Sequence, residues 1–543
     1  MSTGIDRINM QIMWNRLIAV VEEQAQTLIR TAFSSMVREC GDLSAGVFDL
    51  DGKMLAQAVT GTPGHVNSMA ESVKHFIDRF PVAEMQEGDI YITNDPWMGT
   101  GHLNDFVLTT PAFHKGKLVA LFSCTSHLID IGGIGFGPDA TDVHMEGIYI
   151  PFLKLADRGV MNETLLAMVR ANTRQPVESE GDVYSLAACN DIGCERLSEM
   201  MGEFGLDDLD ELGTYIIDRS REAVLAEVAK LPKGVYKNTM PVDGYDAPLD
   251  LVATMTISDE GIHVDYDGTS PMSKLGINVP HAYMTAYTCF GIACAVAPGV
   301  PNNAGSLGPF TVSAPHGSIL NAPKPAAVSS RHITGQMLPD VVFGCLRQAI
   351  PDRVPAEGTS CLWNLNMRGR NLGANEAGAG YVVTVVTNGG TGARPNKDGL
   401  SATAFPSGVR ANPIEIMESI SPLVFWKKEL RPDSGGEGRY SGGHGQSIVV
   451  ENRHGEPFDI LASFDRIDHA PRGRDGGADG ANGYVGLASG RKLNGKGFQE
   501  IPPGDQLIVE TPGGAGIGDP AARDDDAVQA ERRDGLIGAL AAE

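Results

Sequence analysis

The hydrophobic positions of the amino-terminal segment repeat with the period of an α-helix. Between residues 12 and 29 apolar side chains recur every three or four residues, with charged and amide side chains between them. This spacing predicts an amphipathic helix whose apolar stripe packs on the amino-terminal domain or on a subunit. Residues 33–41 are expected to continue it.

Shorter apolar runs beyond this helix have the length of strands. Residues 45–50 and 53–58 flank Asp51-Gly52, a dipeptide typical of a type I′ turn, which predicts a β-hairpin. Residues 87–93 and 117–125 are further predicted strands. An amphipathic helix is expected from about residue 68 to residue 80, and His65 is expected in the loop before it, where capping or contact with a metal or substrate would explain the segment equally well.

The pattern turns helical at residues 162–231 and then changes to β. The acidic run 207–211 is expected to be a solvated turn. Strands are predicted at 234–243, 249–257 and 262–266, and helices at 283–296 and 336–349. From residue 369 onward glycine, asparagine and short strands dominate. The glycine runs at 389–392, 435–438 and 513–516 could bind phosphate through their backbone amides, but no Lys in the chain is followed by Ser or Thr, as a phosphate-binding loop requires. These runs are therefore interpreted as tight β turns.

These elements predict an α+β, multidomain chain with mixed sheets, helical insertions and a β-rich, Gly-rich C-terminal half. The expected divisions are 1–160, an α+β domain that carries the chemistry; 161–232, a helical segment; 233–365, an α/β middle domain; 366–520, a β-rich domain; and 521–543, a charged tail.

Composition narrows the class of protein. The chain has 543 residues, of which 42% are hydrophobic and 20% charged, as in soluble globular proteins. Its net charge of −25 argues against a nucleic-acid partner and gives no attraction to an anionic membrane. The eight cysteines are scattered, the amino terminus has no secretory core, and the longest apolar stretch, 286–300, is interrupted and too short to span a bilayer. A cytoplasmic protein is expected.

Potential metal ligands gather in residues 94–146. His102 and Asp105 are three residues apart behind Gly99 and Gly101, which favour a turn, and His127 follows the predicted strand 117–125. Three ligands from two loops would leave a coordination position open, as catalytic metal sites do. A surface hydrogen-bonded pair is the competing interpretation of His102 and Asp105. The same stretch also holds further imidazoles and carboxylates: Asp130, Asp142, His144 and Glu146.

Several blocks of sequence resemble the hydantoinase B/oxoprolinase family, which includes large subunits of ATP-dependent hydantoinases and lactamases and the metal-bearing subunit of acetone carboxylase. The blocks run nearly from end to end and are F-S-S-M-V-R-E-C-G-D-L-S-A-G-V-F-D, T-N-D-P, G-H-L-N-D, S-H-L-I-D-I-G-G, E-G-I-Y-I-P, R-P-D-S-G-G-E-G-R-Y-S-G-G and P-G-G-A-G-I-G-D-P. The resemblance implies that His102, Asp105 and His127 are metal ligands and that Asp42 is a possible fourth. One departure is S-H-L-I-D, where relatives often have a second His or a small residue beside the first.

Alternatives remain for the residues around this set. Asp42 with Arg38 and Glu39 could instead form a salt-bridged turn. Arg331, His332 and Thr334 could bind an anion or form a buried polar network. Glu146 or Asp130 is the predicted general base, because either could orient a water or a ligand histidine.

The resemblance also implies a division of labour. A hydantoinase A-like, actin-fold ATPase subunit would use ATP to phosphorylate a cyclic amide, in a heterotetramer or larger assembly. This chain would hold one divalent metal, Zn or Mn with Fe possible, and hydrolyse the activated ring. The alternative is the metal-bearing subunit of an ATP-dependent ketone carboxylase. A third interpretation is a scaffold whose metal is vestigial.

Overall fold

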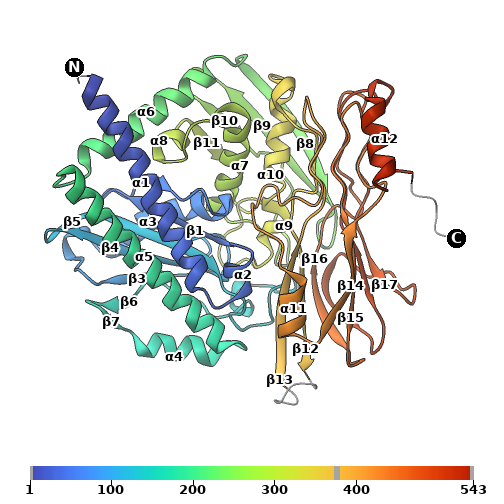
Figure 1. Cartoon of the computed structure of the whole chain (residues 1–543), viewed down its shortest axis with the longest axis horizontal. Coiled ribbons are helices and arrows are strands. Elements are labelled where there is room, and N and C mark those ends of the chain that lie inside the picture. The colour runs from blue at the N-terminus through green and yellow to red at the C-terminus, as the bar shows by residue number, and fades with distance from the viewer. Residues whose placement is uncertain (1–3, 372–378, 539–543) are drawn as a thin grey trace.

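The computed structural model describes residues 4–371 and 379–538 (Figure 1). The chain begins with the long helix α1 (Gly4–Thr31), which confirms the predicted amphipathic helix and extends it. The expected continuation is wrong: the backbone leaves the helix at Ala32, and only a short helix α2 (Ser35–Arg38) follows. The break is fixed by Asp182, whose Oδ1 accepts hydrogen bonds from the backbone amides of Phe33 (2.7 Å) and Ser34 (3.1 Å).

A seven-stranded antiparallel sheet follows, in the order β2-β1-β5-β4-β3-β6-β7. Its strands are β1 (Leu43–Phe48), β2 (Met54–Gln57), β3 (Ile90–Thr93), β4 (Asp105–His114), β5 (Lys117–His127), β6 (Leu153–Asp157) and β7 (Val160–Met161). The predicted hairpin is confirmed, but its turn is not type I′: within Asp51-Gly52 only Gly52 has a positive φ, of 76°. Instead the Asp49 carboxylate accepts from the amides of Asp51 and Lys53 and closes the loop.

Helices cover both faces of this sheet. The predicted helical segment forms α4 (Glu163–Asn172), α5 (Pro176–Phe204) and α6 (Asp210–Val228), and α1, α5 and α6 pack on one face. Helix α3 (Pro63–Arg79) covers the other face. Successive side chains of a strand point to opposite faces, so Phe122 belongs to the first cluster and Leu121 to the second. The central strands are therefore buried on both sides.

Helix α3 begins earlier than expected, at Pro63. Pro63 occupies its first turn, where proline is favoured, and His65 therefore lies inside the helix and not in a preceding loop. The acidic run 207–211 begins as the expected turn after α5, where Asp207 and Asp208 form ion pairs with Lys115 and Lys117, but its last two residues already belong to the first turn of α6. Short 3-10 turns lie at Val82–Glu84 and Val143–Met145.

The middle part of the chain forms a four-stranded sheet in the order β11-β10-β9-β8. Its strands are β8 (Gly234–Val242), β9 (Leu249–Ile257), β10 (Ile262–Asp265) and β11 (Phe310–Ser313), and the predicted boundary near residue 232 falls between α6 and β8. Its helices are α7 (His281–Val296), α8 (Ala304–Leu307), α9 (Arg331–Gly335) and α10 (Leu338–Leu346). The predicted helix 336–349 is thus confined to α10, with α9 just before it.

Two further four-stranded sheets, β13-β12-β16-β18 and β14-β15-β19-β17, form the C-terminal part. The strands are β12 (Trp363–Asn371), β13 (Ala379–Thr387), β14 (Leu423–Leu430), β15 (Gln446–Asn452), β16 (Phe458–Ser463), β17 (Tyr484–Leu487), β18 (Lys496–Ile501) and β19 (Leu507–Glu510), with α11 (Ile414–Ile420) and α12 (Asp525–Arg533) and 3-10 turns at Pro351–Arg353 and Pro520–Ala522. These sheets share one hydrophobic cluster with the middle sheet. The division expected at residue 365 falls inside β12, so a boundary before Trp363 fits the strands better.

The three glycine runs are irregular segments packed backbone against backbone, which corrects their interpretation as tight turns. Gly390 donates to the Pro512 carbonyl (3.0 Å), Gly436 to Gly514 (2.8 Å) and Gly514 to Gly443 (2.8 Å). A Cβ on Gly514 would lie 1.9 Å from a backbone oxygen. Only glycine permits this approach.

The predicted charged tail, 521–543, begins within the Pro520–Ala522 turn and includes α12. Its last five residues lie outside the described part of the chain. Among the helices of residues 4–371 and 379–538, none has the length and apolar character to cross a membrane.

Candidate metal centre

Three neighbouring strands bring candidate ligands to one end of the large sheet. Asp105 is the first residue of β4 and His127 the last of β5, and the two are paired in the antiparallel register. Asp42 directly precedes β1, and its carbonyl accepts a hydrogen bond from the His127 amide at 3.2 Å. The ligands were expected on two loops. The structure places His127 at the carboxyl end of its strand, as the apolar run before it predicts, and places Asp105 on a strand end and not in a loop. Pairing of the two strands fixes their separation.

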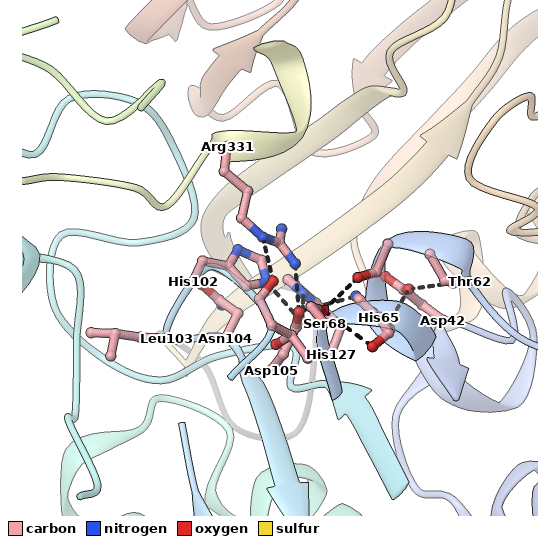
Figure 2. A network of polar contacts seen from close by, with 12 residues as sticks. Asp42, Thr62, His65, Ser68, His102, Leu103, Asn104, Asp105, His127 and Arg331 are labelled. Carbon is pink, nitrogen blue, oxygen red and sulfur yellow. Dashed lines mark hydrogen bonds and ion pairs between the residues drawn. The ribbon is translucent and has the colours of Figure 1, made fainter. Parts of the chain in front are cut away.

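The Asp105 carboxylate is the centre of the cluster (Figure 2). Its Oδ1 lies 2.7 Å from His102 Nε2 and 3.2 Å from His127 Nδ1. Its Oδ2 lies 3.0 Å from His65 Nε2 and 2.6 Å from Arg331 Nη2. The competing interpretation of His102 and Asp105 as a surface pair is wrong, because their exposed fractions are 1% and 0%.

Asp42 joins the cluster through His65 and does not form the alternative salt-bridged turn. Its Oδ1 lies 3.6 Å from His65 Nδ1 and accepts a hydrogen bond from the Thr62 hydroxyl at 3.1 Å. Arg38 pairs with Glu39 instead, at 2.7 Å. His65 therefore lies between the carboxylates of Asp42 and Asp105, and its Nδ1 is buried without a hydrogen-bond partner in the described structure.

The protonation of His102 is set by its second ring nitrogen. Nδ1 lies 2.9 Å from the Ser329 carbonyl oxygen, which can only accept, so Nδ1 carries the proton. Burial and the Arg331 charge lower the pKa of His102 to about 3, which leaves the ring neutral and Nε2 with a lone pair. Two acceptors, Nε2 and Asp105 Oδ1, then face each other at 2.7 Å. A cation that both atoms coordinate satisfies this arrangement.

The donor set as a whole fits a divalent transition metal. One ligand atom from each of His102, Asp105 and His127 lies within 4.8 Å of the others, and all three residues are buried. The hydrogen bond from His102 to a carbonyl is the kind that orients a ligand imidazole. Two histidines and a carboxylate accept Zn, Mn or Fe.

Arg331 closes the cluster from the middle part of the chain. It is the first residue of α9, its Nε donates to the Thr100 carbonyl at 2.8 Å, and its guanidinium stacks 4.0 Å from the Tyr283 ring centre. Gly101, with φ of 97°, permits this contact, since a Cβ there would lie 2.7 Å from Arg331 Cδ. The segment around Arg331 was expected either to bind an anion or to form a buried polar network, and in the structure it forms the network.

Burial and neighbouring charges shift the pKa values of the cluster in opposite directions. Burial alone would raise the pKa of Asp105, but the adjacent His65 and Arg331 hold the pKa of this carboxyl well below its usual range. Burial would lower the pKa of His65, but Asp105 and Asp42 raise it above its ordinary value. Asp105 is thus an anion, which is the form that binds metal.

A small cavity of about 20 Å³ adjoins these groups, enough for one water-sized species. Its walls include Asp42, His65, His102 and His127 together with His332 and the ring of Phe136. The Phe136 ring packs against three imidazoles in tilted or edge-on arrangements, with ring centres 4.7 Å from His127 and 5.7 Å from both His102 and His332. The aromatic cover keeps bulk water from the ligands.

The predicted bases, Glu146 and Asp130, lie outside the walls of this cavity. Glu146 is buried and its Oε1 accepts from the amides of Val328 (2.6 Å) and Ser329 (2.7 Å), so it orients the loop whose carbonyl holds His102. Burial raises the pKa of Glu146 to about 8. Asp130 pairs with Arg174 at 2.7 Å and caps the Gly132 amide.

The other two candidates of the central stretch are not part of the cluster. His144 is exposed, and Asp142 caps the short turn that contains it. Sequence reasoning had left the roles of His65 and Arg331 open and had passed over Thr62 and Phe136. Pro63, at the first position of α3, is a signal that the helix begins before His65.

The fold is similar to that of two solved structures. The ATP-dependent caprolactamase from Pseudomonas jessenii is 26% identical, with a TM-score of 0.89 over 99% of this chain and 95% of that chain. A nucleotide-free acetone carboxylase matches with a TM-score of 0.86 over 99% of this chain and 79% of that chain; at 20% identity, this likeness shows the fold alone. The fold is that of chains from these multidomain, ATP-dependent enzymes.

The chain belongs to the Hydantoinase B/oxoprolinase family, whose model matches residues 6–520. It is 30% identical to the uncharacterized protein MJ0963 of Methanocaldococcus jannaschii, over 96% of this chain and 92% of that protein. It is 29% identical to the B subunit of a putative D-/L-hydantoinase from a Pseudomonas strain, over 98% of this chain and 93% of that subunit. The 5-oxoprolinase of Dictyostelium discoideum is 27% identical over 95% of this chain, which spans only 41% of that protein. The resemblance of the sequence blocks to this family is confirmed.

Proposed function

We propose that the chain is the metal-dependent catalytic subunit of an ATP-dependent, ring-opening amidohydrolase of the hydantoinase, oxoprolinase or lactamase type. One observation carries the proposal: one ligand atom from each of the buried residues His102, Asp105 and His127 lies within 4.8 Å of the others, and His102 Nε2 is 2.7 Å from Asp105 Oδ1. The family and the caprolactamase-like fold support the choice of substrate, a cyclic amide.

His102, Asp105 and His127 would hold one metal ion, Zn or Mn with Fe possible, and Asp42 is the possible fourth ligand. When bound, such an ion supplies a Lewis acid and lowers the pKa of a coordinated water from 15.7 to about 7. Ser329 holds His102 in the ligand tautomer, and Arg331 fixes the Asp105 carboxylate by a charge-assisted hydrogen bond. The Phe136 ring excludes bulk water from the cluster.

Besides His102 and His127, the cavity walls contain three side chains that can accept a proton: the Asp42 carboxylate and the imidazoles of His65 and His332. We assign positioning to Glu146, because its two accepted hydrogen bonds act through the 328–329 loop on His102. Asp130 is held by Arg174 and positions the loop after β5. The base role predicted for these two carboxylates stays a prediction.

The proposal includes a partner that carries the ATPase. Cyclic amides resist attack because nitrogen donates into the carbonyl, and phosphorylation of the carbonyl oxygen removes that resistance. The 5-oxoprolinase relative is more than twice as long as the segment that matches this chain. The remainder of such a protein would correspond to a separate hydantoinase A-like, actin-fold subunit, joined to this chain in a heterotetramer or larger assembly.

A cytoplasmic location is part of the same proposal. All eight cysteines are free thiols in the structure, as in proteins of reducing compartments. ATP, the co-substrate of the proposed partner, is supplied in that compartment.

The second candidate is the metal-bearing subunit of an ATP-dependent ketone carboxylase, favoured by the acetone carboxylase fold. The caprolactamase chain is 26% identical to this chain with a TM-score of 0.89, against 20% and 0.86 for the acetone carboxylase chain. We therefore place hydrolysis first.

The test is ATP consumption by this chain co-expressed with the ATPase subunit, against hydantoins, 5-oxoproline, lactams and small ketones, each with and without bicarbonate. The proposal expects a cyclic amide to trigger turnover without bicarbonate and to yield a ring-opened acid. Turnover that needs a ketone together with bicarbonate would overturn it in favour of the carboxylase. Undiminished turnover by the metal-free complex would favour a scaffold.

A further inference from the structure

A cavity of about 330 Å³ lies beside the carboxyl end of α10, between the middle and C-terminal parts of the chain. It is bounded by β8, by the end of α10, by the segment before β12 and by the loop between β16 and β17. It shares no lining residue with the cavity of the metal cluster. Its side chains are mostly charged groups and amides: Asn238, Arg347, Gln348, Glu357, Arg472 and Arg474.

Arg474 is the buried cation of this lining. Its exposed fraction is 5%, and within residues 4–371 and 379–538 it forms no ion pair. The one hydrogen bond that its guanidinium makes to these residues runs from Nη1 to the Pro355 carbonyl. Its Nε and Nη2 make none but are not sealed from solvent, in contrast to Nε and Nη2 of Arg466. A buried guanidinium without a carboxylate is costly for the fold, which indicates that a ligand supplies the counter-charge.

The Glu357 carboxylate in the lining is already paired with other arginines. Its Oε2 lies 3.3 Å from Arg466 Nη1, and its Oε1 accepts a hydrogen bond from Arg472 Nε at 2.7 Å. Burial lowers the pKa of Arg474, nearby carboxylates raise it, and the guanidinium groups of Arg347 and Arg472 lower it further. The lining thus holds three guanidinium groups and one carboxylate, an excess of two positive charges in a chain whose net charge is −25.

The chain itself orients two of these arginines. Arg472 Nη1 donates to the Thr239 carbonyl at 3.0 Å, and the Arg474 amide donates to a carbonyl of the packed glycine segments at 3.0 Å. Arg347, at the end of α10, has an exposed partner, Asp475, at 3.3 Å. The Arg347 side chain is itself 40% exposed, so solvent screens this pair and Arg347 can turn to a ligand.

Guanidinium groups donate paired hydrogen bonds to oxyanions. A phosphate group presents more acceptor oxygens than a carboxylate and carries about two negative charges, which matches three guanidinium groups with an excess of two charges. We propose that this cavity is an anion site, separate from the metal cluster, that binds the phosphate dianion, free or as the end group of a small ester, through Arg347, Arg472 and Arg474. The site is defined by its own residues and does not depend on the proposed function.

The test is isothermal titration calorimetry of the full-length chain with inorganic phosphate at about pH 8, where the dianion dominates, after a chelator has removed any metal. The site predicts saturable binding of about one phosphate per chain, and the same binding to a folded His127→Ala, because the cavity lies apart from the metal ligands. Arg347→Met should weaken binding about tenfold and Arg474→Met at least as much, the effect of losing hydrogen bonds to a charged group. Arg219→Met, the same change at an exposed arginine of α6, should leave binding unchanged.

A charge reversal keeps the test decisive if Arg474→Met does not fold, since that change removes the donor to the Pro355 carbonyl. Arg347→Glu places a negative charge at a half-exposed position and should abolish phosphate binding in a folded protein. Equal affinity of the wild type, Arg347→Glu and Arg347→Met for phosphate would overturn the site. Loss of phosphate binding in a folded His127→Ala would also overturn it.

Two further anions define the ligand. Acetate, with one charge and two oxygens, should bind at least about tenfold more weakly than phosphate, and equal affinity for the two would overturn the phosphate assignment. Glycerol 3-phosphate separates the two sources of the dianion. Tighter binding of this ester than of phosphate supports an ester whose organic part occupies the rest of the cavity, and weaker binding supports free phosphate.

Discussion

Replacement of Glu146 by glutamine should remove a pH dependence of stability that the wild type carries. Burial raises the pKa of Glu146 from 4.5 to about 8, while nearby Asp142 raises it further and Arg331 and the amides of Val328 and Ser329 lower it. The unfolded carboxyl releases its proton above about pH 4.5. Between these values the folded chain binds more protons than the unfolded one.

This difference in bound protons determines whether the free energy of unfolding rises or falls with pH. The stability that a raised pKa confers on the folded state is fully present below pH 4.5 and is lost as the pH rises through 8. At about 1.4 kcal/mol per pKa unit, the whole window corresponds to at most about 5 kcal/mol. Between pH 5.5 and 8.5 the loss is about 3 kcal/mol. Glutamine cannot ionise, and its Oε1 can still accept from both amides.

The assay is urea unfolding of the wild type and Glu146→Gln at both pH values, with a chelator present so that metal binding does not contribute. The variant should gain about 3 kcal/mol over the wild type between pH 5.5 and 8.5. Glu71→Gln, a change on the exposed side of α3, is the matched control and should show no such gain. A difference between wild type and Glu146→Gln that is the same at both pH values would refute the reasoning.

Five further substitutions, at four positions, have defined outcomes. Arg331→Met should destabilise the fold by about 3–5 kcal/mol in the urea assay, because it leaves the buried Asp105 carboxylate without its arginine partner. Arg331→Lys should recover little of this stability, since one ammonium group cannot make both hydrogen bonds of the guanidinium, to Thr100 and to Asp105. Gly101→Ala should cost about 2 kcal/mol or more, from its φ of 97° and the close Arg331 contact; a thermal midpoint equal to wild type would contradict this. Gly514→Ala should give little folded protein, because a Cβ there would clash with backbone. Gly202→Ala, in an exposed part of α5 with open space around it, should stabilise the protein by about 0.5–1 kcal/mol. Equal yields and melting temperatures of the two variants would count against the packed glycine segments.

Local patterns in the sequence predicted those parts of the site that one or two elements determine. The apolar run before His127 placed this residue at a strand end, and the spacing of His102 and Asp105 suggested that they converge. Both expectations depend on contacts between segments close in sequence. The hairpin β1–β2 and the helical stretch 162–231 were predicted for the same reason.

The remainder of the site comes from contacts that no local pattern encodes. Arg331 reaches Asp105 across 226 residues, and His65 meets the same carboxylate only because α3 packs on the large sheet. The glycine runs were interpreted as turns because glycine is common there, whereas their close packing is a tertiary property. Glu146 was predicted as a base from its residue type, and its partners on the 328–329 loop could not be inferred from spacing.

Metal content and turnover of His127→Ala, compared with His144→Ala, test the central claim most directly. Both histidines come from the same stretch, but His127 belongs to the buried donor set and His144 is exposed. The account predicts about one divalent metal per chain in the wild type and in His144→Ala, and neither metal nor ATP-dependent ring opening in a folded His127→Ala complex. Full turnover by a metal-free, folded His127→Ala complex would contradict it.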